Sequence, residues 1–239
     1  SRFDIPTKLT SINATAFYSD MSMVLVTVSA ENARFSIQND ALVTSGHLVY
    51  YPTGRGGEYT VAPSVTAIDA YAFAYSQIRQ AVLPEELTTI GEFAFLYSCL
   101  ERLDLPEMLT MLGEGCFERN YYLKSVRLNS QLKIIPEKAF SRCTGLTELI
   151  VPENVQLYEV GNDAFYCCSL SDITSFSQNL TVIGKRAFQS NNFSEIKLGK
   201  NVQLWDEAFY GCMELSDVQF AEDTSYTVLP NNLFGYCKS

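Results

Sequence analysis

A small residue, or once leucine, followed by phenylalanine recurs at nearly constant spacing along the chain. The nine pairs are Ala16-Phe17, Ala72-Phe73, Ala94-Phe95, Cys116-Phe117, Ala139-Phe140, Ala164-Phe165, Ala187-Phe188, Ala208-Phe209 and Leu233-Phe234. From Phe73 onward, successive phenylalanines are 22, 22, 23, 25, 23, 21 and 25 residues apart. Such a period indicates a solenoid, because one coil of this length cannot bury its apolar face alone and must stack on its neighbours.

The residues around each phenylalanine divide the repeat into a turn and a strand. An apolar residue and a turn former come five and four residues before it, as in Ile90-Gly91 and Ile183-Gly184. After it, apolar residues are spaced three and then two apart, as in Leu146-Leu149-Val151. The spacing of two is typical of a strand that buries one face. We therefore predict a mainly β repeat solenoid of short parallel strands, with short helical or 3-10 turns between them.

A second series of small polar or polarisable residues stands three positions after each phenylalanine. It consists of Asp20, Ser76, Ser98, Asn120, Cys143, Cys168, Asn191, Cys212 and Cys237. Where the chain turns back into the strand, inward-facing backbone groups need hydrogen-bond partners. We expect these side chains to form a ladder of hydrogen bonds, with the cysteines buried and reduced.

The combined pattern resembles the BspA-like, or Treponema pallidum type, leucine-rich repeat. Residues 87–95 (LTTIGEFAF) and 180–188 (LTVIGKRAF) carry the resemblance most clearly, and it extends from Leu9 to the C-terminus. It implies a right-handed leucine-rich-repeat coil, and residues 1–239 are expected to form a single domain of about nine repeat motifs.

One segment interrupts the repeat, because Phe17 and Phe73 are 56 residues apart. Residues 35–63 alternate apolar and polar positions and contain turn signals at Ser45-Gly46 and in the glycine-rich run 54–57. This pattern predicts a β-hairpin insert, which is also common in the family that the chain resembles. The glycine-rich run lacks the lysine and the following helix of a phosphate loop, so a surface turn is the better interpretation.

Charge and composition argue against several classes of function. The 17 basic and 27 acidic residues give a net charge of −10 without a basic cluster, which disfavours a nucleic-acid partner. No apolar run approaches the length of a transmembrane helix. The seven cysteines and the single histidine, His47, show no metal-ligand spacing. No nucleophile and base can be paired in the sequence, so we expect no catalytic residues, no metal, no cofactor and no enzyme activity.

Two surfaces are candidates for binding. The first is the outward face of the strands, where charges of both signs alternate with the buried positions: Arg102, Asp104, Arg127, Glu148, Asp172, Glu195 and Lys197. The second is an aromatic edge that follows the phenylalanines by one or two residues: Tyr18, Tyr75, Tyr97, Tyr166, Tyr210 and Tyr236. For the first, a solvated sheet face is the competing interpretation, and for the second, rings that merely cover the adjacent turn.

The expected function is that of a non-enzymatic binding module. The resemblance implies a cell-surface or secreted bacterial protein that takes part in adhesion, with a protein or glycoprotein such as host extracellular matrix as its partner. The alternative is a carbohydrate-binding or regulatory accessory domain. The chain begins at Ser1, so a leader could have been removed from it.

Overall fold

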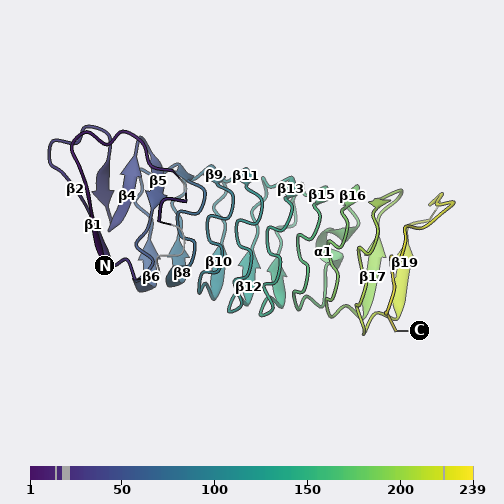
Figure 1. Cartoon of the computed structure of the whole chain (residues 1–239). Helices are drawn as coiled ribbons and strands as arrows, with labels where there is room; N and C mark the ends of the chain where they lie inside the picture. Colours follow the sequence, from purple (N-terminus) through teal and green to yellow (C-terminus); the bar gives the residue numbers. More distant parts are fainter. Residues whose placement is uncertain (14, 18–21, 223, 239) are drawn as a thin grey trace.

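The computed structural model describes residues 1–13, 15–17, 22–222 and 224–238. The chain forms an elongated solenoid whose coils follow one another from the N-terminus to the C-terminus (Figure 1). Most coils have one longer strand, one very short strand and two connecting turns. The predicted mainly β solenoid is therefore confirmed, although almost none of the chain is helical.

The longer strands stack in parallel along one side of the solenoid. Five of them form one sheet, in which neighbours are consecutive coils. They are β6 (Gly56–Thr60), β8 (Gln77–Val82), β10 (Arg102–Asp104), β12 (Ser125–Arg127) and β14 (Glu148–Ile150). Two more, β17 (Glu195–Leu198) and β19 (Asp217–Phe220), form a separate pair. Apolar residues such as Leu103 and Val126 point inward, and the residues that flank Leu103 are exposed.

The short strands stack along the opposite side and form two sheets. The first contains β5 (His47–Tyr50), β7 (Ala67–Ile68), β9 (Thr89–Ile90) and β11 (Met111–Leu112). The second contains β13 (Ile134–Ile135), β15 (Glu159–Val160), β16 (Val182–Ile183) and β18 (Gln203–Leu204). Most of them end at a glycine or proline, such as Gly91 or Pro136, where the chain turns toward the next phenylalanine.

The core is a continuous stack of the repeat phenylalanines. From Phe73 to Phe209 the rings are fully buried and nearly parallel, with centroid separations of 4.7 to 5.5 Å. Phe234 continues the stack at 5.8 Å from Phe209. The alanine or cysteine before each phenylalanine is also buried, because the neighbouring coil leaves room for a small side chain only.

Several ladder residues satisfy backbone carbonyls between coils, as the sequence predicts, whereas the buried Ser76 hydroxyl has no hydrogen-bond partner among the described residues. The Cys143 thiol donates to the carbonyl oxygen of Phe117 at 3.1 Å, one coil back, and the Cys168 thiol donates to that of Phe140. The Asn191 amide donates to Phe165 O and Phe188 O at 2.8 and 2.9 Å. Cysteine and asparagine at this position therefore both donate a hydrogen bond to a backbone carbonyl of the preceding coil. Asp20 lies outside the described residues.

The N-terminal region contains the predicted hairpin turn at Ser45-Gly46, but the hairpin does not extend over all of residues 35–63. Strands β3 (Ser36–Gln38), β4 (Ala41–Thr44) and β5 run antiparallel, but β5 and β6 then join the parallel sheets. Residues 47–62 thus form a coil of the solenoid, in which the Tyr51 ring stacks on Phe73 at 5.2 Å. Tyr51 takes the place of the repeat phenylalanine. Phe17 instead packs on Tyr50 in a separate small core beside β1 (Arg2–Ile5) and β2 (Leu25–Val28).

One coil contains a helical turn in place of its longer strand. Helix α1 (Thr174–Ser177) lies between β14 and β17 and separates the five-stranded sheet from the final pair. The buried residues in this helical segment are Ile173, Phe176 and Ser177. They are spaced three and four residues apart, as on one face of a helix, whereas buried strand residues are spaced two apart. Helix α1 is the single helix in the part of the chain that the structure describes.

Candidate binding surfaces

The strand face places most of the predicted charged residues in two parallel rows. The strand register sets Arg102 beside Ser125 and Glu148 in one row, and Asp104 beside Arg127 in the other. Both Arg102 and Arg127 pair with the Asp104 carboxylate, at 3.4 and 3.5 Å. About half of each side chain is exposed, so these ion pairs are screened and contribute little to stability. Glu195 and Lys197 lie on β17, beyond the break in the sheet.

Asp172 does not lie on the strand face, so its assignment to that stripe is wrong. It precedes α1, and its carboxylate accepts a hydrogen bond from the Thr174 backbone N–H at 2.7 Å. A carboxylate in this position favours a local turn over a strand. The charged stripe is therefore divided into two parts by α1.

The segment around each repeat phenylalanine forms a third side of the solenoid, the turn face. Two residues in each coil, two positions before and two positions after the phenylalanine, adopt left-handed backbone conformations. Examples are Tyr71 and Tyr75 around Phe73, with φ of 59° and 61°. The N–H groups of Tyr71, Phe73 and Tyr75 donate to carbonyls of the next coil. These inter-coil hydrogen bonds hold a conformation that costs a non-glycine residue about 1 kcal/mol or more.

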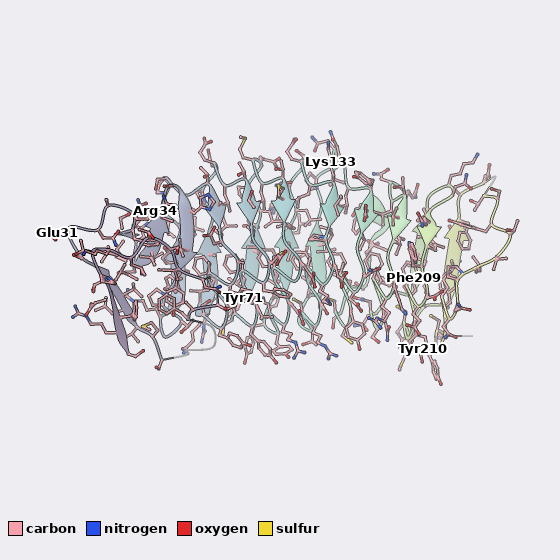
Figure 2. All side chains as sticks on the ribbon, turned by 45° about the horizontal axis from the view of Figure 1, so that its top comes forward. Glu31, Arg34, Tyr71, Lys133, Phe209 and Tyr210 are labelled. Atoms are coloured by element: carbon pink, nitrogen blue, oxygen red, sulfur yellow. The ribbon has the colours of Figure 1, made fainter. Side chains whose placement is uncertain are left out.

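The predicted tyrosine edge lies on this turn face, but in separate groups. Tyr75 and Tyr97 stack at 5.4 Å, and Tyr210 and Tyr236 are in contact at 5.2 Å near the C-terminal end. Tyr166 lies between these groups under the guanidinium of Arg142, 5.1 Å from its ring centroid. Figure 2 shows Tyr210 on this edge, opposite Lys133, which precedes the short strand β13. Tyr18 lies outside the described residues.

The N-terminal group belongs to a larger aromatic patch, made of Tyr71, Tyr75, Phe93, Tyr97, Arg119 and Tyr121. The Tyr71 and Phe93 rings stack with centroids 5.4 Å apart. Tyr75 and Tyr97 form a second stacked pair between the same two coils. Sequence reasoning missed four of the six, although Tyr71 and Phe93 share one repeat position and Arg119 shares another with Tyr75 and Tyr97.

Arg119 is fixed within this aromatic patch by three contacts. Its Nη1 donates to Tyr97 Oη at 2.9 Å, its guanidinium carbon lies 5.2 Å from the Tyr97 ring centroid, and its Nε pairs with Glu118 at 3.1 Å. The hydroxyl of Tyr121 also donates to Tyr97 Oη at 3.3 Å. The hydrogen bonds from Tyr121 and Arg119 lower the pKa of Tyr97.

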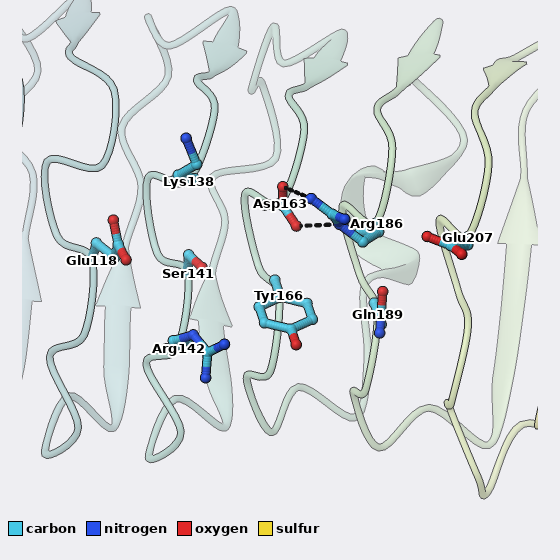
Figure 3. Close-up of a pocket in the computed structure, with 9 residues that line it drawn as sticks. All are labelled: Glu118, Lys138, Ser141, Arg142, Asp163, Tyr166, Arg186, Gln189 and Glu207. Carbon is cyan, nitrogen blue, oxygen red and sulfur yellow. Dashed lines mark hydrogen bonds and ion pairs between the residues drawn. The ribbon is translucent and has the colours of Figure 1, made fainter.

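Toward the C-terminus, the turn face becomes charged and slightly hollowed (Figure 3). The hollow is lined by Glu118, Lys138, Ser141, Arg142, Asp163, Tyr166, Arg186, Gln189 and Glu207. Arg186 binds the largely buried Asp163 carboxylate through two contacts of 2.7 Å. Lys138 lies 2.8 Å from Glu114 and 2.9 Å from Glu137. Asp163 and Arg186 pair within the hollow, while Lys138 and Glu118 pair with residues outside its lining, so most of its charges are held in ion pairs.

Four of the seven cysteines, Cys116, Cys143, Cys168 and Cys212, are buried. Burial raises the pKa of the Cys143 and Cys212 thiols to about 12, and it raises that of Cys116 as well. His47 is half exposed, and its Nδ1 lies 2.8 Å from the Asp69 carboxylate. Within the described ranges, no three histidine, cysteine or acidic residues meet as a metal site would require. None of the helices described is long and apolar enough to cross a membrane.

Comparison with solved structures finds bacterial leucine-rich-repeat proteins. A leucine-rich repeat protein of Eubacterium ventriosum matches 99% of this chain with 20% identity and a TM-score of 0.72, and the match covers 58% of that protein. The pneumococcal vaccine antigen PcpA matches 72% of this chain with 18% identity and a TM-score of 0.53, over 51% of its own chain. A Bacteroides ovatus leucine-rich repeat protein matches 85% of this chain, over 71% of its own, with 18% identity and a TM-score of 0.50. The chain spans little more than half the length of the first two.

A search among curated proteins finds no match. The model of the BspA type leucine rich repeat region, in contrast, matches residues 66–174 and 110–239 in six copies. These ranges contain the buried phenylalanine stack, the hydrogen-bonding ladder and most of the strand face. The chain belongs to the family of BspA-type leucine-rich-repeat proteins.

Proposed function

We propose that the protein is a non-enzymatic interaction module that binds a partner protein through the aromatic patch on its turn face. The observation that carries the proposal is the fixed cluster of Tyr97, Arg119 and Tyr121 beside two stacked aromatic pairs. Tyrosine and arginine are enriched among the residues that dominate binding energy in protein interfaces. Their side chains lose little further freedom here, because the contacts described above already hold them.

The strand face is a weaker candidate for the same role. Its charges are exposed and mutually paired, and α1 interrupts its rows. Exposed ion pairs of this kind affect association rate more than affinity. The stripe of Arg102, Asp104, Arg127, Glu148, Glu195 and Lys197 is therefore proposed as a surface that steers a partner, with the aromatic patch as the binding centre.

A cell-surface or secreted location fits this proposal. Repeats of this family serve as binding scaffolds, and one structural neighbour is described as a vaccine antigen of pneumococcus. The partner class that we propose is an extracellular protein or glycoprotein, such as host matrix. A glycan bound directly on the tyrosines is the alternative, because a stacked tyrosine pair offers an amphipathic surface.

The test is a binding screen with two matched double variants. The protein is screened against a panel of matrix and plasma glycoproteins and, in parallel, against a glycan array. For a confirmed protein partner, Tyr97→Ala with Arg119→Ala is expected to weaken binding tenfold or more. The control, Arg102→Ala with Asp104→Ala, removes an exposed ion pair and should change affinity less than threefold. Equal affinity of both variants and the wild type would refute the aromatic patch, and binding confined to glycans would favour the alternative.

A further inference from the structure

A groove crosses the short-strand side of the solenoid, away from the turn face. It runs over β13, β15, β16 and β18, whose register aligns the outward residues Ile134, Glu159, Val182 and Gln203 in one row. Its lining also includes Pro136, Glu137, Gly161, Asn162, Gly184 and Trp205. The groove therefore spans four coils.

Close packing between coils forms the floor of this groove. A Cβ atom on Gly161 would lie 2.7 Å from the Glu137 nitrogen, and one on Gly184 would lie 2.6 Å from the Asn162 nitrogen. A side chain at either glycine would meet the backbone of the preceding coil, so both positions stay without one along the groove. Gly161 and Gly184 thus permit the close coil spacing on this side, and the lack of side chains there contributes to the groove.

Trp205 closes one end of the groove, at the repeat position that glycine occupies in earlier coils. Its backbone N–H donates to Ile183 O, as the Gly184 N–H donates to Val160 O. It is the only tryptophan in the sequence, and 49% of it is exposed. The exposed part of the indole is available to a partner, and tryptophan is one of the residues enriched in binding hot spots.

The charge of the lining is negative. Its two ionisable residues are Glu137 and Glu159, and Glu137 is already paired with Lys138 at 2.9 Å. In the part of the chain that the structure describes, no cation pairs with Glu159. Tryptophan offers the best ring face for a cation among the aromatic residues. An unpaired carboxylate and an exposed indole in one groove complement a positively charged ligand.

We propose that this groove is a second binding site, which takes an extended lysine- or arginine-rich segment of a protein. One cationic side chain lies over the Trp205 ring and another lies at the Glu159 carboxylate. The strands β15 and β18 are two strand spacings apart, about 10 Å, and three residues of an extended polyproline II segment cover about that length with their side chains on one face. The segment therefore runs along the solenoid axis with its cations about three residues apart.

The single tryptophan allows a direct test. Titration with a hexalysine peptide is expected to change the Trp205 fluorescence saturably, whereas hexaglutamate and maltohexaose leave it unchanged. Glu159→Gln should weaken hexalysine binding about two- to fivefold. By calorimetry, Trp205→Ala should weaken it by a similar factor or more. Glu195→Gln on the strand face makes the same change in net charge and should leave the affinity unaltered.

Several outcomes would overturn the proposal. The first is an unchanged Trp205 emission with hexalysine, and the second is a response to maltohexaose in its place. The third is equal weakening of hexalysine binding by Glu159→Gln and Glu195→Gln, because that result would indicate general attraction to an acidic protein. The Tyr97→Ala and Arg119→Ala double variant must retain the hexalysine response, because the groove and the aromatic patch lie on different sides. The proposal for the groove and the proposal for the aromatic patch can therefore be refuted independently of each other.

Discussion

Replacing Phe140 with alanine tests the core stack at its centre. The Phe140 ring is fully buried between Phe117 and Phe165, at centroid separations of 5.2 and 5.3 Å and interplanar angles of 10° and 5°. Truncation of a core phenylalanine costs about 3–5 kcal/mol, because it removes buried surface and leaves a cavity. Two aromatic pairs are lost at once, so we expect a value in the upper half of this range.

The measurement is urea denaturation followed by circular dichroism and by Trp205 fluorescence. The two signals report the whole chain and its C-terminal part respectively, so they reveal whether the solenoid unfolds as one unit. Phe234→Ala is the matched control, since Phe234 is only partly buried and stacks on one ring at 5.8 Å. Its expected cost is about 1–2 kcal/mol. A Phe140→Ala protein within 1 kcal/mol of the wild type, or equal losses at both sites, would refute the continuous stack.

Three further predictions concern the coil spacing, the turn face and the ladder. Gly113→Ala should destabilise the protein by about 2 kcal/mol or more in a thermal melt, because the new Cβ would lie 2.4 Å from the Glu92 nitrogen. An unchanged melting temperature would show that the coils can separate at little cost. Ser190→Gly should stabilise by about 0.5–1 kcal/mol, since φ is 58° and glycine adopts this region without strain, whereas Ser190→Ala should give no gain. The buried Cys143 and Cys212 thiols have their pKa raised to about 12 from the usual 9.0, so folding favours their protonated form. Their contribution to the free energy of unfolding is complete below pH 9.0 and is lost as the pH rises toward 12. The urea concentration at the unfolding midpoint should therefore decrease as the pH is raised above about 9. The decrease should be smaller in a variant with both thiols replaced by alanine.

Much of the fold could be predicted because the same requirements for core packing and backbone hydrogen bonding recur from coil to coil. The phenylalanine stack and the ladder of Cys143, Cys168 and Asn191 are each dictated by local chemistry that is visible in one sequence. Tyr51 was missed because tyrosine followed by proline does not resemble the repeat pair, although its ring serves the same place in the stack. Asp172 was misplaced because its coil keeps the apolar residues but changes their spacing from that of a strand to that of a helix.

The binding surfaces were harder to predict, since they depend on contacts between coils. The positions of Tyr75 and Tyr97 indicated an aromatic edge, but the part of Arg119 follows from its hydrogen bond to a tyrosine 22 residues earlier. Likewise, Trp205 stands out only when it is aligned with the glycines of preceding coils.

The left-handed residues of the turn face have a consequence for how this scaffold can change. Tyrosine, arginine, lysine, aspartate, cysteine and serine all occupy these positions with φ between 54° and 61°, as at Arg119, Lys138, Asp163, Cys167 and Tyr75. Inter-coil hydrogen bonds set the backbone there, so exchanging one non-glycine side chain for another alters the displayed chemistry at nearly constant folding cost. Randomising these rows in adjacent coils would produce a library of binders on one backbone. Point substitutions along the same rows give a natural lineage an equally direct route to new ligands.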